Sequence, residues 1–299
     1  MLPIAFHPLY THPLPEGHRF PMLKYDLLPK QLLYEGTAKS SDFFEPDTVD
    51  IEHVLAVHKK KYVEDFISLQ IEPKAARKIG FPLSNELVER ELRIANGTII
   101  ASEMALQNGI AFNIAGGTHH AFSDHGEAFC MLNDQAIGAQ YLLNKNLAKK
   151  ILIVDLDVHQ GNGTAEIFAT NDKVFTFSMH GKTNYPFVKE RSDLDIALEN
   201  NTTDAIFLET LSAILPKLIE NQKPDFIYYL AGVDILATDK LGHLGCTLSG
   251  CKKRDDIVLS LCKKFEIPIQ VSMGGGYSPE IKTIIEAHAN TYRVANHYY

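Results

Sequence analysis

The sequence lacks several features that would place it in a specialised class of protein. It has no tryptophan and only four cysteines, none of them spaced as CxxC. This argues against a disulfide framework or a structural zinc knuckle and favours a reducing compartment. No apolar run approaches the length of a transmembrane helix, and the first residues lack the basic and apolar regions of a signal peptide. We therefore expect a cytoplasmic protein without a membrane partner.

Positive charge is also in short supply. The 299 residues include 37 acidic and 29 basic side chains, which gives a net charge of -8. This balance gives no support to direct binding of nucleic acid, and it is weakly compatible with a basic peptide or amine as substrate. The apolar fraction of 45% is that of an ordinary globular protein.

What the sequence does contain, from residue 110 onward, is a regular alternation of strand and helix patterns. Such alternation predicts a parallel sheet with helices on both faces. No linker or internal repeat divides the chain, so residues 1–299 are expected to form a single domain. The expected strands are 110–116, 151–157, 173–180, 225–234 and 268–276, and each is followed by a helical pattern.

The pattern before residue 110 is mostly helical. Ser84 is expected to cap a long amphipathic helix that ends near Gln107. The preceding segment, 71–82, has the composition of a surface loop. The other elements expected here are a strand at 3–6 and helices near 22–33, 52–58 and 60–69.

The most informative stretch is KILIVDLDVHQGNGT, residues 150–164. It begins as a buried apolar strand, and then Asp155, Asp157 and His159 follow at intervals of two. Side chains alternate along a strand, so these three are expected to point the same way at its carboxyl end. Carboxylates and an imidazole leaving one face together need a cation or hydrogen-bond partners, so the pattern indicates either a metal site or an ion-pair network.

Other chemically active side chains also follow the predicted strands. In a parallel sheet the ligand site lies beyond the carboxyl ends of the strands, so these residues should gather at one edge and raise the expectation of a metal site. They are His119 and His120 after the first strand of the series, His180 after the third, Asp234 after the fourth and Tyr277 after the last.

These residues suggest a division of roles. Asp157, His159 and Asp234 would bind a catalytic zinc and leave a position open for water, although ferrous iron suits the same set. Asp155 would hold an imidazole in one tautomer. His120 is expected to act as general base, with an imidazolium of the His119-His120 pair as acid, and Tyr277 is expected to stabilise an oxyanion. Together they predict metal-assisted hydrolysis of an amide.

The same residues resemble the zinc-dependent histone deacetylase family. The resemblance covers nearly the whole chain and is carried by HRF, GGTHHAF, GEAFCMLND, DLDVHQGNGT, SMH, AGVD and GGGY. It implies the arginase/deacetylase fold, an α/β sandwich with an eight-stranded, mostly parallel sheet. It also implies zinc on Asp157, His159 and Asp234, His119 and His120 for proton transfer, and Tyr277 at the transition state. It further implies a structural potassium ion at Asp155, Asp157, His159, Ser178 and the carbonyl of Met179.

The resemblance also bears on the substrate. Phe129 and Gly275 match the acyl tunnel, and either Tyr185 or Phe187 is expected to form its second wall. The motifs HQGNG and AGVDILATDKLGHLG are most similar to the class IV branch, a resemblance that implies long-chain deacylation of lysine more than deacetylation. Asn162 stands where class I members carry an aspartate beside the second histidine.

Three other functions compete with this interpretation. An acetylpolyamine deacetylase would use the same metal centre on a small acylated amine instead of an acyl-lysine peptide or protein. An arginase-type enzyme with two metals is disfavoured, because Gly161 stands where that family has another aspartate. A binding module without activity is disfavoured, because every expected ligand, both histidines and the tyrosine are present. The sequence does not indicate an oligomeric state.

Overall fold

In the computed structural model, which describes residues 2–299, the chain is built around one sheet of eight parallel strands. Their order across the sheet is β2-β1-β3-β8-β7-β4-β5-β6, and every pairing is parallel. This confirms the expected α/β class. The strands are β1 (Ile4–Ala5), β2 (Phe43–Phe44), β3 (Ile110–Asn113), β4 (Ile151–Asp155), β5 (Val174–Gly181), β6 (Leu194–Leu198), β7 (Phe226–Leu230) and β8 (Ile269–Ser272).

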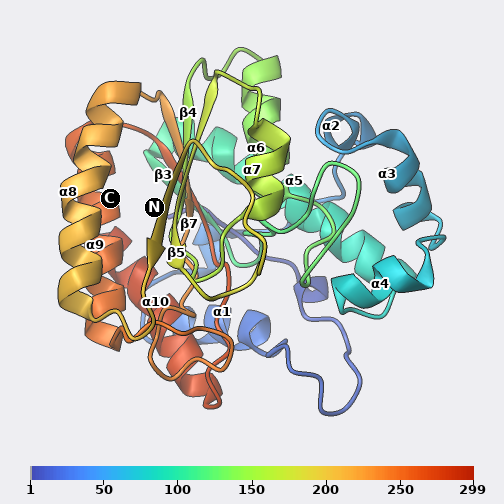
Figure 1. Ribbon diagram of the computed structural model, residues 1–299, viewed down its shortest axis with the longest axis horizontal. Coiled ribbons are helices and arrows are strands. Elements are labelled where there is room, and N and C mark those ends of the chain that lie inside the picture. Colours follow the sequence, from blue (N-terminus) through green and yellow to red (C-terminus); the bar gives the residue numbers. More distant parts are fainter. Residues whose placement is uncertain (1) are drawn as a thin grey trace.

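Helices cover both faces of this sheet (Figure 1). Helices α8, α9 and α10 lie on one face and α5, α6 and α7 on the other, while α2, α3 and α4 form an outer group beyond α5. The helices are α1 (Lys24–Tyr34), α2 (Ile51–Leu55), α3 (Lys60–Ile67), α4 (Pro73–Ile79), α5 (Asn85–Asn108), α6 (Asp134–Asn144), α7 (Asn162–Phe168), α8 (Asp204–Gln222), α9 (Leu248–Lys264) and α10 (Ile281–Tyr298). Short 3-10 turns occupy Pro8–Tyr10 and Ser40–Asp42.

Local signals set the helix boundaries near the centre of the sheet. The Ser84 hydroxyl accepts a hydrogen bond from the Leu87 amide and caps α5, as expected, and Gly109 ends that helix with a φ of +83°. Asn133 caps α6 in the same way through the amide of Ala136. Helix α5 therefore ends directly before β3, and α6 begins against β7, where Gln135 Nε2 donates to the Tyr229 carbonyl at 3.2 Å.

Three of the helices and strands were not expected from the sequence. The segment expected to be a surface loop contains α4, which begins at Pro73 and ends before Gly80 in the left-handed conformation. Strand β6 lies in the stretch expected to be irregular. It was not predicted because its alternating LDIAL sequence is only half-buried, at the edge of the sheet. Strand β2 is two residues long and leaves almost no pattern to detect.

The strand order matters most for the site. Strands β3, β8, β7 and β4 are consecutive neighbours, so the loops that leave their carboxyl ends meet over the middle of the sheet. Among residues 2–299, none of the helices combines the length and apolar composition needed to cross a bilayer.

Candidate active site

Three potential metal ligands converge above the ends of β4 and β7. Asp157, His159 and Asp234 are all buried, and one ligand atom from each lies within 4.8 Å of the others. The Nδ1 atom of His159 is 3.0 Å from Asp157 Oδ1 and 3.2 Å from Asp234 Oδ2. The expected set is therefore brought together in space.

The loop after β4, not the strand itself, brings these side chains together. Strand β4 ends at Asp155, so the prediction that three alternating residues of one strand share a face is wrong. Instead, Asp155 Oδ1 accepts a hydrogen bond from the amide of Asp157 at 3.1 Å, and Asp157 Oδ1 accepts one from the amide of His159 at 2.9 Å. Each aspartate thus folds the backbone two residues ahead of it, as short polar side chains do in turns.

Backbone donors from neighbouring loops fix the two carboxylates. Asp234 Oδ1 accepts from the amide of Val158 at 2.9 Å, and Asp157 Oδ2 accepts from the amide of Gly275 at 2.7 Å. A Cβ atom at Gly275 would overlap the Asp234 carboxylate. Glycine is therefore required here because the loop after β8 lies directly against the ligand set.

The charges of this cluster are consistent with a bound cation. Burial alone would raise the pKa of Asp157, but the hydrogen bond from His159 and the nearby imidazoles hold it well below its usual value. Burial raises the pKa of Asp234, and the Asp157 charge raises it further. Two buried carboxylates and one imidazole form a donor set that suits a divalent ion, which would offset their mutual repulsion.

The tandem histidines have different partners although they are adjacent in sequence. His119 Nδ1 lies 2.7 Å from Asp155 Oδ2, and His120 Nδ1 lies 2.7 Å from Asn162 Oδ1. Burial would lower the pKa of His119, but the Asp155 carboxylate raises it above its usual value. Burial, with the charges of His119 and His159, lowers the pKa of His120 well below the usual value. The first imidazole is therefore biased toward the charged form and the second toward the neutral form.

Tyr277 lies where two pockets meet. An inner cavity of about 40 Å³ and an outer pocket of about 390 Å³ share Tyr277, Phe129, His120 and His159 in their walls. The Tyr277 ring is 6.3 Å from the His159 ring and 5.9 Å from the Phe20 ring, centre to centre. Burial and the charges of Asp234 and Asp157 raise its pKa well above the usual value, so the phenol keeps its proton.

The expected tunnel residues divide between these pockets. Phe129 lines both, and Gly275 lines only the inner cavity. Tyr185 and Phe187 both line the outer pocket, but only Tyr185 reaches the histidines, with its ring edge-on to His120 at 5.0 Å. Phe187 is 88% exposed and belongs to the rim.

The residues expected around potassium lie beside the same cluster. Strand register pairs Asp155 with Ser178, and Met179 follows on β5. His180, in contrast, does not join the site: it lies within β5, its Nδ1 is 3.0 Å from Ser178 Oγ, and it lines neither pocket. The expectation that His180 belongs with the active residues is therefore wrong, because the strand continues through it to Gly181. The potassium assignment stays a prediction.

Two contributors were not anticipated. Lys24 is fully buried and donates a hydrogen bond to the Gly274 carbonyl at 3.1 Å, and burial lowers its pKa to about 8. Asp239 accepts the amide of Tyr277 at 2.6 Å and fixes the start of the tyrosine loop. Lys24 lies four and eight residues before Leu28 and Leu32 on the apolar stripe of α1, which is a signal that the sequence did offer.

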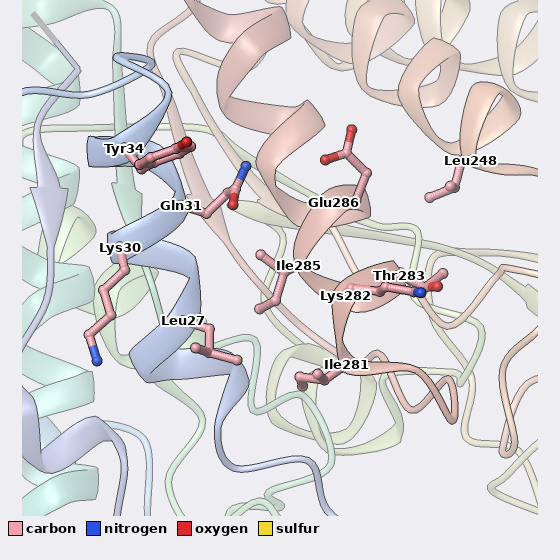
Figure 2. A pocket seen from close by; sticks show the side chains of 10 residues that line it. All are labelled: Leu27, Lys30, Gln31, Tyr34, Leu248, Ile281, Lys282, Thr283, Ile285 and Glu286. Carbon is pink, nitrogen blue, oxygen red and sulfur yellow. The ribbon is translucent and has the colours of Figure 1, made fainter.

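A larger hollow lies elsewhere, between α1 and α10 (Figure 2). Its volume is about 760 Å³, and its walls include Leu27, Tyr34, Ile281 and Ile285. None of the predicted site residues lines it. The volume of a pocket therefore does not identify the candidate active site, whereas the cluster of potential metal ligands does.

Comparison with known proteins identifies first the fold and then the family. The chain superposes on a crystal structure of a histone deacetylase homologue in complex with SAHA with a TM-score of 0.84 at 23% identity, covering 99% of this chain and 84% of the other. The HD domain of HDA15 gives a TM-score of 0.82 at 19% identity, covering 98% and 90%. The fold is therefore the arginase/deacetylase fold. The histone deacetylase domain family matches residues 18–292, and the chain belongs to that family.

The proteins that this chain is similar to carry different names. An uncharacterised protein of Picosynechococcus is 43% identical over 99% of both chains. Histone deacetylase 2 of Arabidopsis thaliana is 28% identical over 90% of this chain and 72% of its own length. The acetoin utilization protein AcuC of Staphylococcus aureus is 29% identical over 87% and 72%. Membership of the family supports amide hydrolysis of the deacetylase type.

Proposed function

We propose that the protein is a metal-dependent deacylase that hydrolyses the amide of an acylated amine, with Nε-acyl-lysine in a peptide or protein as the first candidate substrate. One observation carries the proposal. His120, His159 and Tyr277 line both the inner cavity and the outer pocket, while His119 and Asp157 line the inner cavity and Asp234 lies beside them in the ligand cluster; this arrangement supports a single bound amide among these six residues.

The residues around the amide have complementary tasks. Zinc or ferrous iron, held by Asp157, His159 and Asp234, would supply Lewis-acid polarisation of the amide carbonyl and acidification of a water molecule. With its Nδ1 directed at the Asn162 side-chain oxygen, neutral His120 has Nε2 free to accept the proton of the attacking water. His119, held by Asp155, supplies a proton to the leaving amine. The Tyr277 hydroxyl donates to the developing oxyanion.

The two pockets also support an orientation of the amide. The protein to which an acyl-lysine belongs must stay outside the site, so the lysine side chain enters through the outer pocket. The amine therefore occupies the outer pocket, and the acyl group occupies the inner cavity. An apolar cavity of about 150 Å³ holds one benzene molecule. The inner cavity, at about 40 Å³, is much smaller and favours an acetyl group over the long acyl chain implied by the class IV resemblance.

A second ion is part of the proposal. A potassium ion would be held beside the ligands of the catalytic ion, between β4 and β5, by Asp155, Asp157, His159, Ser178 and the Met179 carbonyl. The pairing of Asp155 with Ser178 in the sheet supports this placement. Its role would be to fix the loop that carries Asp157 and His159.

The experiment that tests the proposed function is hydrolysis by the metal-loaded protein of one peptide bearing acetyl, butyryl, octanoyl or myristoyl lysine. Metal content is measured in parallel by elemental analysis. We expect stoichiometric zinc or iron and the highest kcat/KM with acetyl-lysine. If the loaded protein cleaves none of these peptides and no small acylated amine such as N-acetylputrescine, the proposed function is wrong.

A further inference from the structure

The mouth of the outer pocket is basic, although the chain as a whole is acidic. The net charge is -8, yet the outer pocket is lined by Arg19, Lys78 and Lys240 and, among the described residues, by no aspartate or glutamate. All three cationic side chains are on exposed residues. A concentration of one sign at a pocket entrance attracts ligands of the opposite sign.

Two of these cations have no acidic partner. Arg19 and Lys240 form no ion pair with any residue in the range 2–299, and Arg19 instead lies over the Phe129 ring, 5.0 Å from its centre. Some other surface lysines do have acidic partners: Lys30 is 2.7 Å from Asp26, and Lys59 is 2.8 Å from Asp124. The positive charge at the mouth is therefore available to a ligand.

Two carboxylates near the mouth, those of Glu127 and Asp239, are already engaged. Glu127 faces His125, accepts from the Tyr185 hydroxyl and lies 3.2 Å from Lys78 Nζ, and the hydrogen bonds from these groups lower its pKa to about 2. Asp239 accepts the amides of Leu241 and Gly242 with one oxygen and that of Tyr277 with the other. Of the three cations at the mouth, Lys78 is paired with Glu127, whereas no residue between 2 and 299 forms an ion pair with Arg19 or Lys240.

We propose that the preferred substrate is an acylated amine with an anionic group, a carboxylate or a phosphate, on its leaving-amine side. This inference rests on the proposed function, because that function places the amine side in the outer pocket. The anionic group would lie between Arg19 and Lys240, whose guanidinium and ammonium groups bind such anions through charge-assisted hydrogen bonds. An acylated polyamine would bring a second ammonium group to the same place and be repelled.

The test uses probes that differ mainly in charge. Acetyl-lysine tripeptides flanked by glutamate, glutamine or lysine report on a peptide substrate, and 4-acetamidobutyrate against N-acetylputrescine reports on a small molecule. We expect kcat/KM to be roughly tenfold higher for the anionic member of at least one series than for its cationic member, and we expect this ratio to shrink as salt is added. Equal rates in both series, or preference for the cationic probes, would overturn the inference.

Variants show whether the named residues are responsible. The double variant Arg19→Gln/Lys240→Gln should bring the ratio to within about twofold, whereas Arg19→Lys/Lys240→Arg should keep most of it. Lys282→Gln is the matched control, since it removes an exposed lysine from the hollow between α1 and α10 and should leave the ratio unchanged (Figure 2). A ratio that persists in the double Gln variant would also overturn the inference.

Binding separates this inference from the proposed function. Fluorescence anisotropy with the same labelled tripeptides measures affinity without requiring turnover. If no probe is hydrolysed but the glutamate peptide binds more tightly and loses that advantage in the double Gln variant, the anion site stands and the deacylase proposal fails. If all probes are hydrolysed without any charge preference, the deacylase proposal stands and the anion site is overturned.

Discussion

The two halves of the active-site pocket differ in size, charge and burial. The inner cavity is about 40 Å³ and is enclosed by buried residues such as Phe81, Ile94 and Gly275, whereas the outer pocket is about 390 Å³ and ends at exposed Arg19 and Lys240. A close-packed enclosure discriminates by shape, because each extra methylene group must displace a neighbour. An open, charged mouth discriminates by electrostatics. If the proposed function is right, one pocket would therefore apply two independent kinds of selection to the two ends of the same amide.

The largest expected effect is at Tyr277, on the boundary between the inner cavity and the outer pocket. Its role does not depend on selection of the substrate by either pocket. Tyr277→Phe removes only the hydroxyl, and we expect kcat to fall by roughly 10²–10³ with little change in KM, because that hydrogen bond forms mainly in the transition state. The loss should be the same for anionic and cationic probes. An unchanged kcat in a folded, metal-loaded variant would remove Tyr277 from the mechanism.

The next effect tests how closely the inner region is packed. Gly275→Ala places a methyl group where the Asp234 carboxylate lies and shifts the amide that binds Asp157. Disturbing the groups that orient metal ligands typically weakens metal affinity by about 10–100-fold. We therefore expect a comparable loss in a metal-binding titration followed by elemental analysis.

A glycine far from the ligands provides the control for this substitution. Gly36 has a positive φ of +76°, but nothing lies within 4 Å of a Cβ placed there. Gly36→Ala therefore strains the backbone without displacing any neighbour, and it should leave metal affinity unchanged. Equal metal affinity in the Gly275→Ala variant and the wild type would mean that the loop after β8 has room to move.

The preferred acyl-chain length distinguishes two expectations: the small inner cavity favours an acetyl group, whereas the class IV resemblance implies a long chain. We expect kcat/KM to fall at least about tenfold from acetyl-lysine to octanoyl-lysine on one peptide, since forcing extra methylenes into a packed site costs roughly 1–3 kcal/mol. Ile94→Ala, which shortens a buried side chain in the cavity wall, should raise the butyryl rate relative to the acetyl rate. A wild-type rate that rises toward myristoyl-lysine would instead support long-chain deacylation and require the cavity to open.

The two regions also differ in how far sequence predicted them. The ligands, the tandem histidines and Tyr277 carry their chemistry in short motifs, and the parallel order of the strands is enough to bring those motifs together. The detailed route was not predictable, because Asp157 and His159 converge through turns after β4 that depend on hydrogen bonds formed only in the fold. The basic mouth of the outer pocket was even harder to predict from the sequence. Arg19, Lys78 and Lys240 come from three distant segments, and the overall charge of -8 gave no indication of them, being weakly compatible with a basic substrate instead.

The smallest expected effect tests the contribution of charge at the mouth of the outer pocket. Glu127→Gln removes the one carboxylate paired with a cation of the mouth, so the charge of Lys78 is no longer offset. Because Lys78 is exposed and screened by solvent, we expect only a two- to threefold further increase, roughly, in the ratio of glutamate-flanked to lysine-flanked kcat/KM. The double variant Glu127→Gln/Lys78→Gln should return the ratio to the wild-type value, because it removes the offset and the cation together. If Glu127→Gln instead lowered kcat equally for every probe, the carboxylate would be acting through Tyr185 and His120 as a positioning group rather than through the charge of the mouth.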